Sequence, residues 1–299
     1  MNQLILTSIE QGLIFSILAM GVVLTYKILD MADLSVEGSF PLGAFVFAKF
    51  ILSGAPPLVA TMLAFVFGSA AGLVTALLFV KLRIRPLLSG ILTMTMLYSF
   101  NLRLNGRANI PLFSTSNVFA GGNKLIILIA VILIIKILLD WFLKTEFGYL
   151  LIATGDNESL VRSLGENSNK YKIVGFMLSN GLVSIAGAMM AQYQGFADIT
   201  MGSSIIVVAL ASIIIGETVR KNSGKIALTT RAIIGALSYK LIGGIAIDLG
   251  LSPTDLKAIS AIIVIAFISY NNFSSPILKS IKKQGGKTVA RHSKPLEEF

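Results

Sequence analysis

The sequence predicts an all-α membrane protein, a polytopic bundle of about eight or nine transmembrane helices. The chain has 299 residues, of which 55% are hydrophobic and only 13% are charged. A soluble domain carries roughly 25% charged residues. Long apolar runs alternate with short polar loops. Every backbone group in lipid must be bonded within its own segment, so these runs are expected to be helices.

Residue types argue against several kinds of chemistry. There is no cysteine, and the one histidine, His292, lies in a polar tail. We therefore expect no disulfide, no thiol chemistry, no metal site and no histidine base. The net charge is +10, and six basic residues fall between Lys279 and Lys294. By the positive-inside rule, this charge indicates that residues 271–299 form a cytoplasmic tail, and it does not point to a nucleic-acid partner. Residues 1–299 are expected to form a single transmembrane domain.

The N-terminal third predicts a broken helix. Ile9–Tyr26 is apolar and long enough to cross the membrane. Lys27–Glu37 interrupts it with three acids, and the apolar run Phe40–Leu52 that follows is about 13 residues long, too short to span alone. That run also contains Pro41 and Gly43. We expect it to be the second half of a discontinuous helix.

The remaining apolar runs predict the other crossings. They are Leu58–Val80, Leu87–Leu102, Lys124–Leu143, Lys172–Ala191, Ser203–Gly216, Ile226–Ile247 and Leu256–Tyr270. Ser203–Gly216 is about 14 residues, so it is either a short span or a re-entrant half. The basic loop Lys81–Pro86 should be cytoplasmic, whereas the polar loop Arg103–Asn123 should face outside although its two arginines oppose the charge rule. Small residues four apart in Lys172–Ala191 predict close helix packing.

The longest internal polar segment, residues 144–171, predicts a partner surface. Gly155 is expected to break the chain, and Asp156 to cap a short new helix. The apolar residues of this helix and its C-terminal stop are Leu160, Val161, Leu164 and Gly165. An apolar face held in water is a docking surface. The alternative is a connecting loop that contains one turn of helix.

Scarce polar groups near the broken helix predict a solute path. The segment Asp33–Gly38 offers two carboxylates, the Ser35 hydroxyl and a glycine for close backbone approach, so Asp33, Ser35, Glu37 and Gly38 are candidate path residues. Further candidates in neighbouring runs are Thr93, Thr95, Tyr98, Asn101, Gln192, Gln194 and Glu217. The alternative is a cytoplasmic loop with solvated acids, and ordinary packing for the others.

Two stretches carry a resemblance to a known family. The run LDMADLSVEGSFPLGA, residues 29–44, resembles the N-terminal signature of bacterial ABC importer permeases of the branched-chain amino acid type. The sequence from Asp33 to Gly38 looks most like that of a subgroup described as tryptophan/tyrosine transport permeases. Gly148–Gly195 is similar to a loop and helix shared with permeases for sugars and nucleosides. The family's usual Gly-Gly pair reads Gly216–Glu217 here.

The resemblance implies a single permease domain over residues 1–299, in a bacterial plasma membrane. It implies an importer subunit for a small solute, first of all an aromatic or branched-chain amino acid. Such a subunit is not itself an enzyme and needs no cofactor. Its implied partners are two cytoplasmic ABC ATPase subunits, an extracytoplasmic solute-binding lipoprotein, a second permease copy or a sister permease, and membrane lipid. It also implies that the helix in residues 144–171 couples to the ATPase. The alternatives are an ABC permease for sugars or nucleosides, a scaffold, and an ion-coupled carrier that uses Asp33, Glu37 or Glu217.

Overall fold

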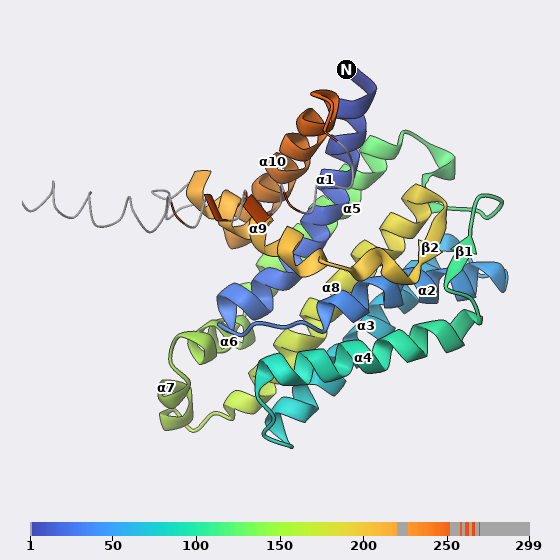
Figure 1. Cartoon of the computed structure of the whole chain (residues 1–299). Helices are drawn as coiled ribbons and strands as arrows, with labels where there is room; N and C mark the ends of the chain where they lie inside the picture. Colours follow the sequence, from blue (N-terminus) through green and yellow to red (C-terminus); the bar gives the residue numbers. More distant parts are fainter. Residues whose placement is uncertain are drawn as a thin grey trace, which may run out of the picture.

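The computed structural model describes residues 2–219 and 227–251, with six further residues between 258 and 269. In Figure 1 these residues form a helical bundle with one small β-ribbon. The predicted crossing Leu256–Tyr270 lies largely outside the described residues, and the tail 271–299 lies wholly outside them.

The N-terminal half contains five long helices and a π-helical turn. They are α1 (Asn2–Val23), η1 (Leu24–Ile28), α2 (Val36–Leu52), α3 (Pro57–Val80), α4 (Pro86–Asn105) and α5 (Lys124–Leu143), with β1 (Asn109–Pro111) and η2 (Val118–Gly121) before α5. The C-terminal half contains α6 (Glu146–Asp156), α7 (Glu158–Ser163), α8 (Ser168–Gln194), β2 (Phe196–Asp198), η3 (Ile199–Gly202), α9 (Ile205–Val219) and α10 (Leu228–Asp248).

Within the described ranges, six helical segments are long and apolar enough to cross a membrane. They contain α1, α3, α5, α8, α9 and α10. α2 has only 17 residues, and α4 has a less apolar composition that includes Arg103. The polytopic membrane bundle is confirmed, whereas a total of eight or nine crossings stays a prediction.

The predicted helix break is confirmed, and the structure gives its limits. Residues 29–35 are not helical, and α2 begins at Val36 instead of Phe40. Pro41 lies inside α2 and has no N–H to offer the carbonyl of Glu37, one turn earlier. Gly202 of η3 packs at that carbonyl, where a Cβ atom would lie only 1.9 Å from the Glu37 oxygen. The proline thus opens a place for the backbone of η3.

The long helix α8 runs through the middle of the bundle, packed against α1, α2 and α3 (Figure 1). Its small residues allow backbone-to-backbone contact, as predicted. A Cβ atom at Gly187 would lie 1.8 Å from the Phe40 oxygen, and one at Gly43 would lie 1.9 Å from the Ser184 oxygen. α2 is almost entirely buried between these neighbours.

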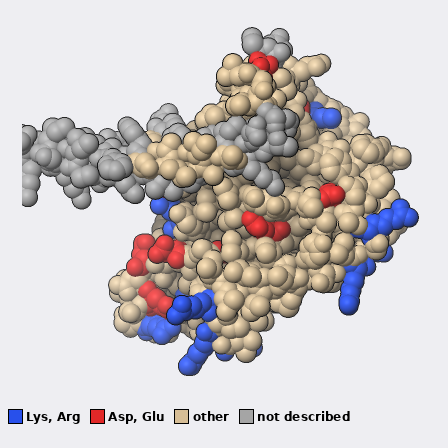
Figure 2. All heavy atoms as spheres, in the orientation of Figure 1, with Lys and Arg blue, Asp and Glu red and all other residues tan. Residues whose placement is uncertain are grey.

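The two ends of the bundle differ in what they hold. At one end α7 and the start of α8 lie near the basic loop 81–86, and the groove of about 950 Å³ between them is lined by Arg83 and Arg85. The start of α1 and the end of α10 meet at the opposite end, where a Cβ atom on Gly244 would contact Ser8. In Figure 2 lysines and arginines gather at the edges, and the face between them is largely apolar or uncharged. This distribution suits a protein that crosses a membrane.

Candidate functional site

A pocket of about 560 Å³ lies between α2, α4 and η3. Its polar lining consists of Glu37, Thr95, Tyr98, Asn101, Thr200 and Ser203. Gly38 and Pro41 from the start of α2 also line it. The structure therefore brings together five of the predicted path residues from α2 and α4, which lie about 60 residues apart in the chain. They are Glu37, Gly38, Thr95, Tyr98 and Asn101.

Asn101 gives this pocket an acceptor. Its Nδ2 atom donates to the Gly38 carbonyl at 3.4 Å, which ties α4 to α2. Its Oδ1 atom is buried and has no hydrogen-bond partner among the described residues. Buried polar atoms are usually paired, so an unpaired acceptor on a residue that lines the pocket makes Asn101 a candidate ligand contact.

Asp33 and Ser35, two predicted path residues, do not line the pocket but belong to a buried polar network. Asp33 is only 2% exposed. Its Oδ1 atom accepts from the Ser35 N–H at 2.9 Å and the Ser35 hydroxyl at 2.6 Å. Its Oδ2 atom accepts from Asn180 Nδ2 at 2.8 Å, and Asn180 Oδ1 accepts from Ser39 at 2.6 Å. The network fastens the helix break to α8.

Sequence reasoning missed Asn180 as a partner of Asp33. The available signal was one amide side chain in an otherwise small and apolar stretch of α8, Ser179–Gly181. Such a polar group inside a membrane helix needs a partner. The pattern could not say which of the scattered acids would supply it.

The other predicted path residues do not line this pocket. Thr93 is buried, and its hydroxyl donates to the Ser89 carbonyl at 3.0 Å. Gln192 donates to Thr61 at 3.0 Å and accepts from the Val118 N–H at 3.0 Å, so it joins α8 to α3 and η2. Gln194 has a buried Oε1 atom without a partner among the described residues. Glu217 forms an ion pair with Lys27 at 2.9 Å.

Residues 144–171 form two helices, and two local predictions for them are wrong. Gly155 does not break the chain but lies inside α6, where a Cβ atom would come within 1.8 Å of the Ile28 oxygen. Asp156 is the last residue of α6, and the N-cap of α7 is Asn157, whose side chain accepts from the Leu160 N–H at 3.1 Å. Both residue types cap helices well, so the sequence did not separate the two neighbouring positions.

The rest of α7 follows the predicted pattern. Gly165 has a φ of +83°, the left-handed conformation that favours glycine after a helix. Val161 is buried, whereas Leu160 is 51% exposed and Leu164 is 65% exposed. Val161 therefore anchors α7 to the protein, and the two leucines stand out from it.

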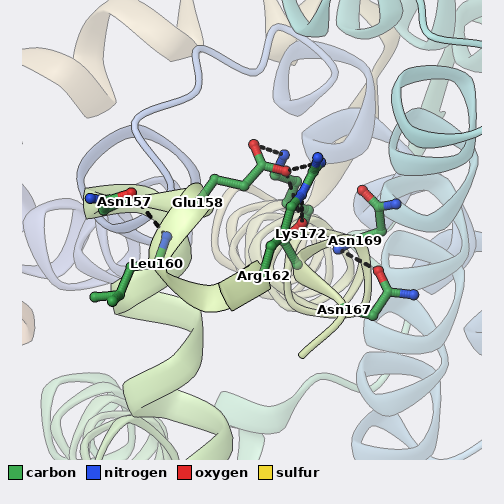
Figure 3. A network of polar contacts seen from close by, with 8 residues as sticks. Asn157, Glu158, Leu160, Arg162, Asn167, Asn169 and Lys172 are labelled. Atoms are coloured by element: carbon green, nitrogen blue, oxygen red, sulfur yellow. Dashed lines mark hydrogen bonds and ion pairs between the residues drawn. The ribbon is translucent and has the colours of Figure 1, made fainter. Parts of the chain in front are cut away.

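A polar network holds α7 against the start of α8 (Figure 3). Glu158 pairs with Lys172 at 2.8 Å and with Arg162, and it accepts from the Ser168 hydroxyl at 2.8 Å. Partial burial raises the pKa of Glu158, but the hydrogen bond and the charge of Lys172, together with the hydrogen bonds from Ser168 and Arg162, outweigh it and lower that pKa to about 2. The carboxylate stays ionised, and the exposed leucines are carried on a fixed helix.

Comparison with known proteins identifies the family. The family model described as branched-chain amino acid transport system / permease component matches residues 4–273. The chain belongs to this permease family. The permease is thus a component of an ABC-type transport system, and subunits of this kind are not enzymes.

Three relatives illustrate the range of similarity. The permease is 45% identical over 98% of both chains to a tyrosine transport system permease protein of Clostridioides difficile (strain R20291). It is 33% identical to an uncharacterized protein of Rickettsia prowazekii (strain Madrid E), over 89% of this chain and 97% of that one. It is 26% identical to a ribose import permease protein of Escherichia coli (strain K12), over 88% and 84% of the two chains. No solved structure matches the permease.

Proposed function

We propose that the permease imports an aromatic amino acid of the tyrosine type through the pocket between α2, α4 and η3. The pocket carries the proposal because it combines Glu37, the unpaired Asn101 Oδ1 atom and the Tyr98 ring. A carboxylate complements the ammonium group of an amino acid, and an aromatic ring stacks on an aryl side chain. The 45% identity to a tyrosine transport permease supports the same substrate class.

The proposal includes the partners that such a permease needs. Two ABC ATPase subunits supply the energy from the cytoplasm, an extracytoplasmic lipoprotein delivers the solute, and a second copy or a sister permease completes the path. The site is in a bacterial plasma membrane, with the tail 271–299 in the cytoplasm. The groove beside α7 contains Arg83 and Arg85, which agrees with a cytoplasmic position for that end of the bundle.

Coupling is proposed to depend on α7. Leu160 and Leu164 are exposed on a helix that Val161 and the Glu158 network hold in place. The double substitution Leu160→Asp/Leu164→Asp should leave the permease inserted but remove the copurifying ATPase and the ATP-dependent uptake. The control is Leu249→Asp, because Leu249 is 81% exposed at the other end of the bundle. Normal ATPase yield and intact uptake in the double variant would refute the docking role.

The substrate pocket is tested separately, through Glu37. Glu37→Gln removes the charge at nearly constant shape, and tyrosine uptake should fall about tenfold or more if the carboxylate pairs with the ammonium. Asp30→Asn is the matched control, because Asp30 is an exposed acid at the same helix break. Copurification of the ATPase should be unchanged in both variants. Unchanged tyrosine uptake in Glu37→Gln would remove Glu37 from the path.

The alternatives receive less support. An ion-coupled carrier needs a carboxylate that is buried without a partner. Asp33 accepts three hydrogen bonds, and Glu217 is ion-paired with Lys27. A sugar permease is favoured only by the 26% identity to the ribose import permease protein and by the polar lining of the pocket. Competition of labelled tyrosine uptake by excess ribose would favour the sugar over the amino acid.

A further inference from the structure

A second pocket, of about 380 Å³, lies between α1, α9 and α10. Ser203 lines both this pocket and the one between α2, α4 and η3, so the two cavities flank the start of α9. Its walls are mostly apolar, with Phe15, Ile205 and Val208 among them. A volume of several hundred Å³ is typical of small-molecule sites.

The distinctive group in this pocket is Lys240 of α10. Its Nζ atom lies 3.7 Å from the centre of the Phe15 ring and 3.4 Å from Gln11 Oε1. No acidic side chain is found among the described residues that line the pocket. An amine in apolar surroundings is unfavourable unless an opposite charge joins it, and an aromatic ring and a long amide contact compensate only in part. The pocket therefore favours an anionic ligand.

The position of the amine restricts the ligand further. Lys240 lies eight residues before the end of α10, which is about 12 Å along the helix, and the pocket extends along α1 from Phe15 to Leu4. A ligand with its anion on Lys240 must therefore place an apolar body along this cavity. An amino acid fits poorly, because its ammonium group would find no carboxylate among the described lining residues.

We propose that this pocket binds an apolar monocarboxylate of the fatty-acid class, with the carboxylate on Lys240 and Gln11 and the hydrocarbon against Phe15 and Val208. The hydrocarbon gains from leaving water, and the carboxylate replaces the aromatic ring as the partner of the amine. This site is separate from the tyrosine pocket and does not depend on the proposed transport function.

The test measures binding of radiolabelled decanoate to the whole permease in nanodiscs of zwitterionic lipid. Lys240→Met removes the charge but keeps most of the stem, and affinity should fall roughly tenfold or more, as for loss of a hydrogen bond to a charged group. Lys240→Arg keeps the charge and should retain binding. Lys124→Met is the matched control, because Lys124 also faces a ring, with Nζ 5.7 Å from the Tyr193 centre, but is exposed and outside the pocket.

Competition defines the ligand class. Excess decanoate should displace the label, whereas decanol, which lacks the charge, and tyrosine, which adds an ammonium group, should not. Equal binding in Lys240→Met and Lys124→Met would overturn the site, and so would displacement by decanol. Displacement by tyrosine that depends on Lys240 would overturn the ligand class. Glu37→Gln should bind decanoate normally, so failure of one pocket is distinguishable from failure of the other.

Discussion

Replacing Asp33 by alanine should destabilise the permease strongly, because one carboxylate satisfies three buried donors. These are the Ser35 N–H, the Ser35 hydroxyl and Asn180 Nδ2, at 2.9, 2.6 and 2.8 Å. Hydrogen bonds between membrane helices contribute about 0.6–2 kcal/mol each, and a donor left buried without a partner costs about 1–3 kcal/mol. Since Ser35 and Asn180 can partly re-pair with each other, we expect a net loss of about 2–3 kcal/mol.

The assay is the thermal midpoint of the detergent-purified permease after a fixed heating time, read by size-exclusion chromatography. A loss of about 2–3 kcal/mol lowers the midpoint by roughly 4–12 °C in a protein of this size. Asp33→Asn should cost less, because its carboxamide keeps one acceptor and the Asn180 amide can turn. Asp30→Asn serves as the control, because Asp30 is exposed and its φ of 53° is one that asparagine adopts readily.

One result would refute this reasoning directly. If Asp33→Ala and Asp30→Asn gave the same midpoint as the unaltered permease, the network would not hold the helix break to α8. A drop in uptake with an unchanged midpoint would also contradict it, because Asp33 would then act on the solute and not on the fold.

Two further predictions test packing and charge. Gly187→Ala places a Cβ atom 1.8 Å from the Phe40 oxygen, so it should destabilise the permease by more than the roughly 1–3 kcal/mol of ordinary overpacking. Its thermal midpoint should fall, whereas that of the control Gly121→Ala, which has open space around the glycine, should not change. Equal midpoints in the two variants would contradict the close contact. Glu158 has a pKa lowered from 4.5 to about 2, so its stabilisation is complete above about pH 4.5 and is lost as the pH falls toward 2. The stability gap between the unaltered permease and Glu158→Gln should therefore be constant near neutral pH and close over that range; a gap that closes at higher pH would point to another group.

Part of this architecture could be predicted because it depends on residues that are close together in the sequence. The run Phe40–Leu52 is too short to span the membrane and contains Pro41, and these two features predict the helix break. The polarity of residues 144–171 predicts the loop that carries the exposed leucines. The pairing of Asp33 with Asn180 joins residues 147 positions apart, so it depends on how α8 passes the break. Local pattern carries no information about such a contact.

The second pocket shows the same limit in another form. In the sequence, Lys240 is one lysine inside the apolar run Ile226–Ile247, and a long lysine side chain can extend along a helix toward the membrane surface. Only the crossing of α1 over α10 places Phe15 and Gln11 beside its amine. None of these three residues is therefore predicted from the sequence.

The glycine contacts of α8 have a mechanical consequence. Where Gly187 meets the Phe40 carbonyl and Gly43 meets the Ser184 carbonyl, two main chains touch with no side chain between them. Such a contact has no rotamer that can change, and packed interfaces shift between discrete arrangements instead of deforming gradually. We therefore expect α2 and α8 to move together as one rigid body, so that the conformational change of a transport cycle falls on the non-helical residues 29–35 and on the turn after α8.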